Sequence, residues 1–102
     1  MRFLTKPNVY VLGGVQEIDI ITKDRNNTVF IPSEARLSIK EPGPAGVIVT
    51  VSGDQLQTAS GYQFYLYRPP TIGWYEYEVW VKDGSGREDT ETNGFEVIDR
   101  VY

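Results

Sequence analysis

Apolar and polar residues alternate along most of this chain with a period of two. The alternation is strictest in EARLSIK (34–40), where Ala35, Leu37 and Ile39 are separated by charged or polar residues. A period of two is typical of a β-strand with one buried face. The pattern recurs over 15–22, 47–52, 62–67, 73–82 and 92–101, and NVYVL (8–12) adds a short apolar segment. No window places apolar residues at helical spacing, so we expect an all-β protein of about seven or eight strands.

The phase of each alternation predicts which side chains face the core. The predicted inward residues include Ile18, Ile20, Tyr75, Tyr77, Val79, Val81, Phe95 and Val97. The opposite row of 73–82 holds Trp74, Glu76, Glu78, Trp80 and Lys82. In 62–67, Tyr62, Phe64 and Leu66 share one face, and we expect Tyr65 and Tyr67 to point outward from the other.

Turn-forming residues separate the alternating segments at intervals of about 8–15 residues. EPGPAG (41–46), for example, has two prolines that cannot donate to a strand ladder and two glycines that relax the backbone. Many short strands with regular turns favour a single antiparallel two-sheet sandwich. The 102 residues fit one domain over 8–102, and we expect residues 1–7 to form an N-terminal arm that orders on assembly.

Composition argues against most catalytic chemistry. The chain has no cysteine and no histidine, so Ser-His and Cys-His dyads and the usual zinc ligands are unavailable. We therefore expect no enzyme activity, no cofactor and no metal. The net charge is −4, so the chain lacks the excess of basic residues that nucleic-acid-binding proteins usually carry, and we expect no nucleic-acid partner. No run of about 18 apolar residues is present, so we expect no membrane span.

Two groups of carboxylates have ordinary structural explanations. Asp83, Glu88, Asp89 and Glu91 surround a Gly-rich turn, and their spacing matches no EF-hand calcium loop. Glu76 and Glu78 share one face of a strand, about 7 Å apart. Paired carboxylates can hydrolyse glycosides, but a flat outer sheet face offers no pocket that would raise the pKa of one of them.

Four aromatic residues are candidates for an interface. Trp74 and Trp80 lie in one outward row, and tryptophan is enriched at interface hot spots because one rigid ring removes a large apolar area from water. Tyr65 and Tyr67 form the second predicted outward pair, on the opposite sheet. The alternative for the tryptophans is that neighbouring side chains shield Trp80 and that Trp74 packs under a loop. For the two tyrosines it is that they are half-buried sheet aromatics, which β propensity favours.

The stretch GWYEYEVWVKDGSG (73–86) resembles the sixth strand of immunoglobulin-like β-sandwich modules. In such modules the first tyrosine closes a corner by hydrogen bonding back to the preceding connection, and Tyr75 occupies that position. A narrower resemblance covers nearly the whole chain, through YVLGGVQEIDI, IPSEARLSIKEPGP and ASGYQFYLYRPPTIGWYEYEVWVKDGSG. Together these stretches resemble small stand-alone immunoglobulin-like proteins of tailed bacteriophages, associated with the head, neck or tail.

That resemblance implies a non-enzymatic structural protein of the virion, assembled in the host cytoplasm. Its expected partners are other virion proteins, in multiple copies on a symmetric assembly, with no role for nucleic acid or a membrane. The alternative is a carbohydrate-binding or adhesion module that stacks glycans on exposed aromatics. A sugar platform requires two or three coplanar rings on one face, which distinguishes the two hypotheses.

Overall fold

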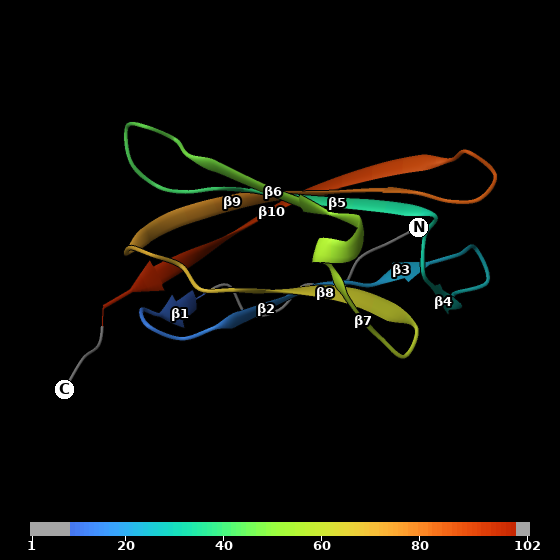
Figure 1. Cartoon of the computed structure of the whole chain (residues 1–102), viewed down its shortest axis with the longest axis horizontal. Helices are drawn as coiled ribbons and strands as arrows, with labels where there is room; N and C mark the ends of the chain where they lie inside the picture. Colours follow the sequence, from blue (N-terminus) through green and yellow to red (C-terminus); the bar gives the residue numbers. More distant parts are fainter. Residues whose placement is uncertain (1–8, 100–102) are drawn as a thin grey trace.

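The computed structural model describes residues 9–99, and the arm expected over residues 1–7 lies outside them. The described chain forms ten strands and one short 3₁₀ turn (Figure 1). The strands are β1 (Val9–Val11), β2 (Gln16–Ile20), β3 (Thr22–Lys23), β4 (Val29–Phe30), β5 (Glu34–Lys40), β6 (Ile48–Ser52), β7 (Gln57–Ala59), β8 (Tyr62–Tyr67), β9 (Gly73–Lys82) and β10 (Glu88–Ile98). The 3₁₀ turn, η1 (Gly53–Gln55), follows β6.

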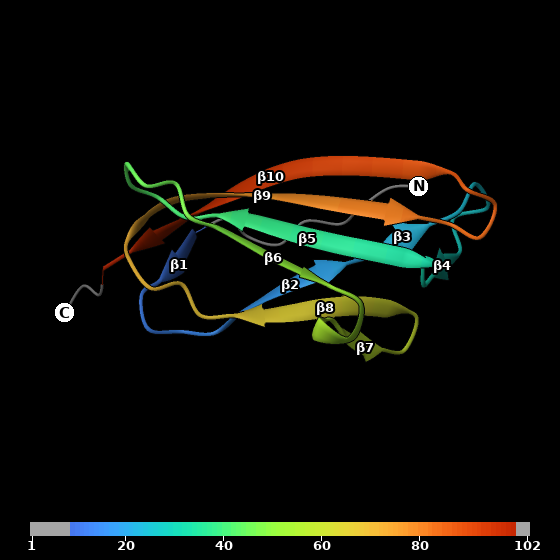
Figure 2. The same ribbon diagram turned by 45° about the horizontal axis from the view of Figure 1, so that its top comes forward.

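The strands form two facing layers. The large sheet has the order β1-β10-β9-β5-β6, and the small sheet has the order β2-β8-β7. Figures 1 and 2 show these two sheets as separate layers, with the β3–β4 hairpin at one end. The predicted all-β class is confirmed.

Two details of the predicted sandwich are wrong. The sheets are not wholly antiparallel, because β1 pairs in parallel with β10, from Val9 opposite Glu96 to Val11 opposite Ile98. The Tyr10 ring packs edge-on against the Phe95 ring, with 5.3 Å between centroids, which holds β1 at this edge. The ten strands exceed the predicted number because β3 and β4 have only two residues each, too few to show an alternation.

The core lies between the two sheets and is built mainly from the predicted inward rows. Leu37 and Ile39 of β5 and Val81 of β9 are fully buried. The small sheet contributes Ile18 and Ile20 of β2 to the same cluster. Strict alternation in these strands places every second side chain against the opposite sheet.

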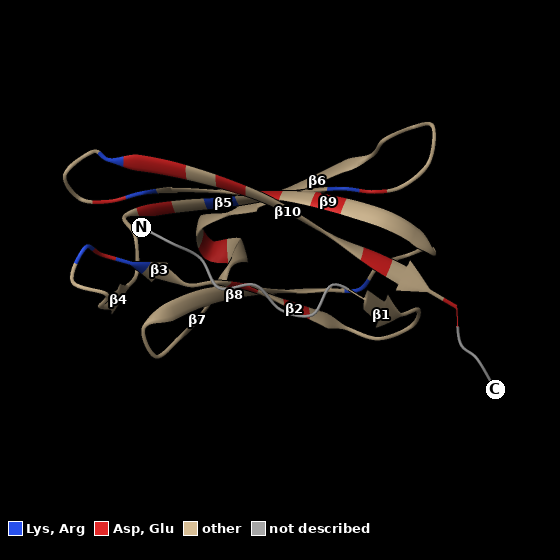
Figure 3. Ribbon diagram, turned by 180° about the vertical axis from the view of Figure 1, so that it is seen from behind, with Lys and Arg blue, Asp and Glu red and all other residues tan. Residues whose placement is uncertain are grey.

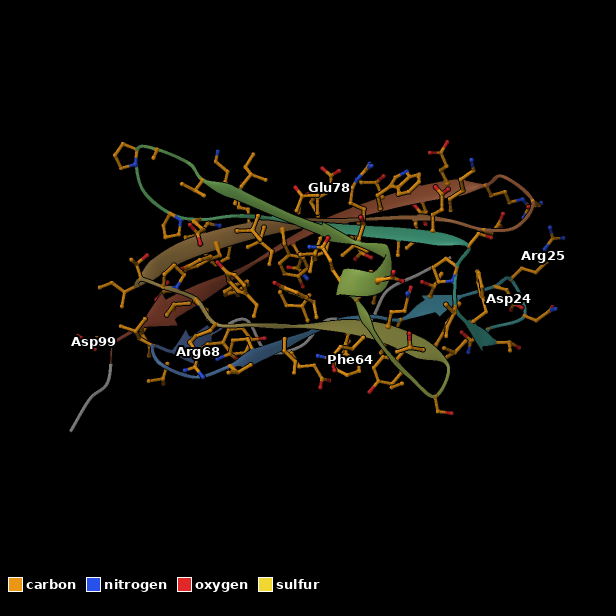
Figure 4. All side chains as sticks on the ribbon, viewed as in Figure 1. Asp24, Arg25, Phe64, Arg68, Glu78 and Asp99 are labelled. Atoms are coloured by element: carbon orange, nitrogen blue, oxygen red, sulfur yellow. The ribbon has the colours of Figure 1, made fainter. Side chains whose placement is uncertain are left out.

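Strand β8 has the opposite orientation from the predicted one. Tyr67 is only 7% exposed and packs edge-on against Tyr75, and Tyr65 packs partly buried against the core. Leu66, on the other row, is 44% exposed, and Figure 4 shows Phe64 on the outer side of the small sheet. Tyr65 and Tyr67 therefore do not form the expected outward pair.

A long-range hydrogen bond accounts for the inward position of Tyr67. Its hydroxyl donates to Oε2 of Glu41 at 2.8 Å, so the polar end of the buried ring has a partner. Burial, together with the Glu41 carboxylate, holds the pKa of Tyr67 well above its ordinary value. The bond also ties β8 to the loop that follows β5.

Tyr75 closes the corner at the start of β9, as the sequence predicts. Its hydroxyl donates to the carbonyl oxygen of Thr71 at 2.7 Å and accepts from the Thr71 backbone N–H at 3.2 Å. The fully buried ring stacks on Phe95 with 4.9 Å between centroids. This corner fixes the position at which β9 enters the large sheet, and Tyr75 lies between Trp74 and Glu76 of the outward row.

Candidate functional site

The outer face of the large sheet carries the predicted outward row of β9. Register places Arg36 of β5 opposite Trp80 and Lys40 opposite Glu76. Figure 4 shows Glu78 pointing away from the core, and Figure 3 shows acidic residues along both β9 and β10. The outward placement predicted for Trp74 and Trp80 is confirmed, but their surroundings differ.

Trp80 is covered by side chains of its own chain. The guanidinium carbon of Arg36 lies 4.7 Å from the centroid of the Trp80 ring, within the range of a cation–π contact. The indole N–H of Trp80 donates to Oε1 of Glu88 at 2.9 Å. One ring face and the polar edge are thus occupied, and Trp80 has the character of a half-buried sheet aromatic.

Trp74 is exposed to solvent. It is 49% exposed, and every other aromatic side chain within residues 9–99 is half-buried or buried. Its indole packs against Gly94 of β10, where a Cβ atom would overlap Cζ2 and Cε2 of the ring. The missing side chain of Gly94 therefore allows the ring to approach the β10 backbone closely.

A hollow of about 500 Å³ borders Trp74 on the outer face, and we call it the Trp74 hollow. The expectation that this face is flat and has no pocket beside Glu76 and Glu78 is therefore wrong. Its lining includes Trp74, Ile48, Ser38, Lys40, Glu76 and Glu78. Ile48, on the edge strand β6, is 62% exposed. The Trp74 hollow thus combines an open indole and an exposed aliphatic side chain with two carboxylates and one ammonium group.

The loop between β5 and β6 forms a fixed rim beside Trp74. Pro42 packs against Gly73, whose φ of +133° and close approach to the proline ring leave no room for a side chain. The Glu41 N–H donates to the Val47 carbonyl at 2.8 Å, and the Glu41 carboxylate accepts from Tyr67. The rim is therefore held by both sheets.

Sequence reasoning found Trp74 but missed the residues that make it a site. Gly94 and Ile48 come from strands far from Trp74 in the sequence, and no local pattern links them. The EPGP stretch signals a rigid loop, but its contact with Gly73 depends on the tertiary fold. The sequence signal for the hollow is thus limited to Trp74, an outward residue of β9, and to Gly94, a glycine within the next strand of the chain.

The acidic hairpin after β9 has a structural role. Oδ1 of Asp83 accepts the backbone N–H groups of Ser85 and Arg87, at 2.9 and 3.0 Å, and the hydroxyl of Ser85. The Ser85 hydrogen bond contributes most to lowering the pKa of Asp83 below its ordinary value. Between residues 9 and 99, no three acidic side chains are grouped so that they could hold a metal ion.

Across the described residues, no helix has both the length and the apolar character that a membrane crossing requires. Comparisons with protein-family models, with curated proteins and with solved structures found no match. What the chain binds is therefore inferred from the residues on its outer face.

Proposed function

We propose that the chain is an immunoglobulin-like β-sandwich. The run β10-β9-β5-β6 corresponds to the G, F, C and C′ strands of variable-type domains, and β2-β8-β7 corresponds to B, E and D. The Tyr75 hydroxyl bonded to the Thr71 backbone has the place and partner of the tyrosine corner at the start of strand F. The parallel β1 strand extends this order at one edge.

We further propose that this sandwich is a non-enzymatic structural protein of a tailed phage virion. It acts as a head–tail connector, neck or capsid-decoration subunit by contact with other virion proteins. The sequence resemblance is the reason for proposing a virion protein. The exposure of Trp74, which packs against Gly94, is the structural observation that supports a contact surface at this position. Because the indole already packs against Gly94, a partner can bury it with little loss of conformational entropy.

The Trp74 hollow suits binding better than catalysis. The whole sequence offers no histidine or cysteine to act as base or nucleophile. The hollow instead combines an aromatic anchor with a polar surround, the arrangement found at interface hot spots. Repetition of this contact on a symmetric particle multiplies a modest affinity.

A glycan-binding role has less support. The outer face of the large sheet offers one open ring rather than two, because Arg36 covers Trp80. On the outer face of the small sheet, the Tyr62 and Phe64 rings are inclined by 46° and are not coplanar. A stacking platform of two coplanar rings is therefore absent from these two faces within residues 9–99.

Co-sedimentation with capsids and tails purified from the phage that encodes the chain tests the proposed function. We expect the wild-type chain to sediment with one of these components and Trp74→Ala to lose most of this association. Leu66→Ala is the matched control, because Leu66 is an exposed apolar residue on the opposite sheet. Absence of the wild-type chain from both components would refute a virion role, and equal losses in the two variants would refute the assigned surface.

A further inference from the structure

We infer that the Trp74 hollow receives an arginine side chain from the partner protein. This inference rests on the proposed role of the hollow in protein contact and names the chemistry of what enters it. The occupant is an extended segment of the partner that carries arginine and, four positions away, an aliphatic residue. Three features of the outer face support the arginine, and the position of Ile48 supports the aliphatic residue.

The first feature is a template for the contact in the same strand. Six positions after Trp74, Trp80 holds the Arg36 guanidinium over its ring and a Glu88 carboxylate at its indole N–H. Arg36 reaches that position because it lies directly opposite Trp80 in the β5–β9 register. Strand β9 thus already shows how this face places an arginine over an indole whose N–H is bonded to a carboxylate.

The second feature is that Trp74 lacks the corresponding cation. The β5–β9 pairing ends with Lys40 opposite Glu76, so no β5 residue lies opposite Trp74. On the other side, the register partner of Trp74 is Glu96 of β10. The Arg36–Trp80 pair is the cation–π contact found among residues 9–99, and the Trp74 ring has none there.

The third feature is the charge around the open ring. The lining of the Trp74 hollow carries the carboxylates of Glu76 and Glu78 against the single ammonium of Lys40. Glu96 adds a further carboxylate beside Trp74 in register. A planar guanidinium stacks on an indole while it donates hydrogen bonds to a carboxylate, which a lysine ammonium does less well.

Ile48 accounts for the aliphatic residue of the partner segment. It lines the same hollow. Ile48 of β6 pairs with Lys40 of β5, which pairs with Glu76 of β9, so Ile48 lies two strands away from β9 and level with Glu76, the outward residue that follows Trp74. Strand spacing and rise place the side chains of Ile48 and Trp74 about 12 Å apart. That separation is close to the roughly 13 Å between side chains i and i+4 on one face of an extended strand.

Nuclear magnetic resonance of the two indole N–H groups tests the inference without the partner. The probe is the peptide acetyl-GRGSGI-amide, and its matched control carries citrulline, an uncharged isostere, in place of arginine. Trp80→Phe leaves one indole signal and so assigns Trp74. We expect the arginine peptide to shift the Trp74 signal saturably and to bind about fivefold or more tightly than the citrulline peptide, with little change at Trp80.

Two double variants separate a specific site from general attraction to an acidic protein. Glu76→Gln with Glu78→Gln removes both carboxylates of the hollow, and we expect about a fivefold loss of arginine-peptide affinity. Glu34→Gln with Asp54→Asn makes the same change in net charge outside the hollow, and we expect less than a twofold change. Equal loss in both double variants would overturn the inference.

The remaining outcomes also decide the question. No saturable Trp74 shift at millimolar peptide, or equal shifts with the citrulline peptide, would refute an arginine site. A Trp74 shift caused by maltose but not by the arginine peptide would assign the hollow to a neutral sugar instead. Co-sedimentation is measured separately, so loss of particle binding in Trp74→Ala without an arginine-dependent shift would leave the proposed function standing and refute only this inference.

Discussion

The indole of Trp74 packs against Gly94 of β10 so closely that a Cβ atom at position 94 would overlap the ring, yet the Trp74 side chain remains 49% exposed. The two residues are not direct register partners, since Trp74 lies opposite Glu96 and Gly94 lies opposite Glu76. The contact is therefore a diagonal one between neighbouring strands. It turns a flexible surface side chain into a preorganised one.

Gly94→Ala should displace the Trp74 ring without altering any charge. A methyl group at position 94 overlaps the indole and also approaches the Tyr75 carbonyl oxygen, so we expect a loss of about 1–3 kcal/mol in the free energy of unfolding. The Trp74 fluorescence, recorded in a Trp80→Phe background, should shift to longer wavelength as the ring becomes more solvated. Unchanged emission and stability would contradict the contact.

Tyr75→Phe should destabilise the sandwich through the corner. The substitution leaves the N–H and C=O of Thr71 without the hydroxyl that serves both, and we expect a loss of about 1–2 kcal/mol in urea unfolding. Tyr65→Phe is the matched control, because Tyr65 is a partly buried tyrosine that packs against the same core away from the corner. A loss of similar size in both variants would show that the corner has no special role.

Arg36 and Trp80 should be energetically coupled. A double-mutant cycle with Arg36→Met and Trp80→Leu isolates their contact, and we expect a coupling of about 0.5–1 kcal/mol in the free energy of unfolding. Arg36→Met with Trp74→Leu provides the comparison pair, with an expected coupling near zero. Coupling of Arg36 to Trp74 as strong as that to Trp80 would contradict the different surroundings of the two indoles.

Stability should fall at alkaline pH because of buried tyrosines. Burial is the main cause that raises the pKa of both Tyr67 and Tyr77 in the folded chain above the ordinary value near 10. As the pH rises above that ordinary value, the unfolded chain loses these protons first, so the folded state loses stability by at most about 1.4 kcal/mol per pH unit for each group.

Urea unfolding from pH 7 to 11 measures this effect. We expect a nearly constant contribution from these groups below pH 9 and a decline above about pH 10. Tyr67→Phe should make the decline shallower, and Glu41→Gln should do so partly, because it keeps a hydrogen-bond acceptor but removes the neighbouring charge. An alkaline decline as steep in Tyr67→Phe as in the wild-type chain would exclude Tyr67 as its source.

Local alternation predicted much of the fold because half-buried strands impose it directly. In β5 and β9 every second residue is apolar and the rows between them are mostly polar, so only one orientation buries the core row. In β8 both rows are mainly apolar or aromatic, with Gln63 the one exception, and alternation favoured the wrong row. The bond between Tyr67 and Glu41, 26 residues apart, decides the orientation, and nothing near Tyr67 signals it.

The candidate site shows the same division between local and long-range information. The sequence predicted that Trp74 and Trp80 face outward, but it could not show that Arg36 covers one ring and Gly94 supports the other. Those contacts follow from the pairing of β5 and β10 with β9. The NVYVL segment was predicted as a strand, but the parallel pairing of β1 with β10 was beyond local pattern, because the alternation of three residues carries no information about their partner.

Oxidative footprinting of the assembled particle tests most directly whether Trp74 is the contact residue. Hydroxyl radicals are applied to the free chain and to purified particles that contain it, and mass spectrometry measures oxidation at each tryptophan. We predict that assembly protects Trp74 by about threefold or more while Trp80, already covered by Arg36, changes little. Oxidation of Trp74 at the same rate in the particle as in the free chain would contradict the account.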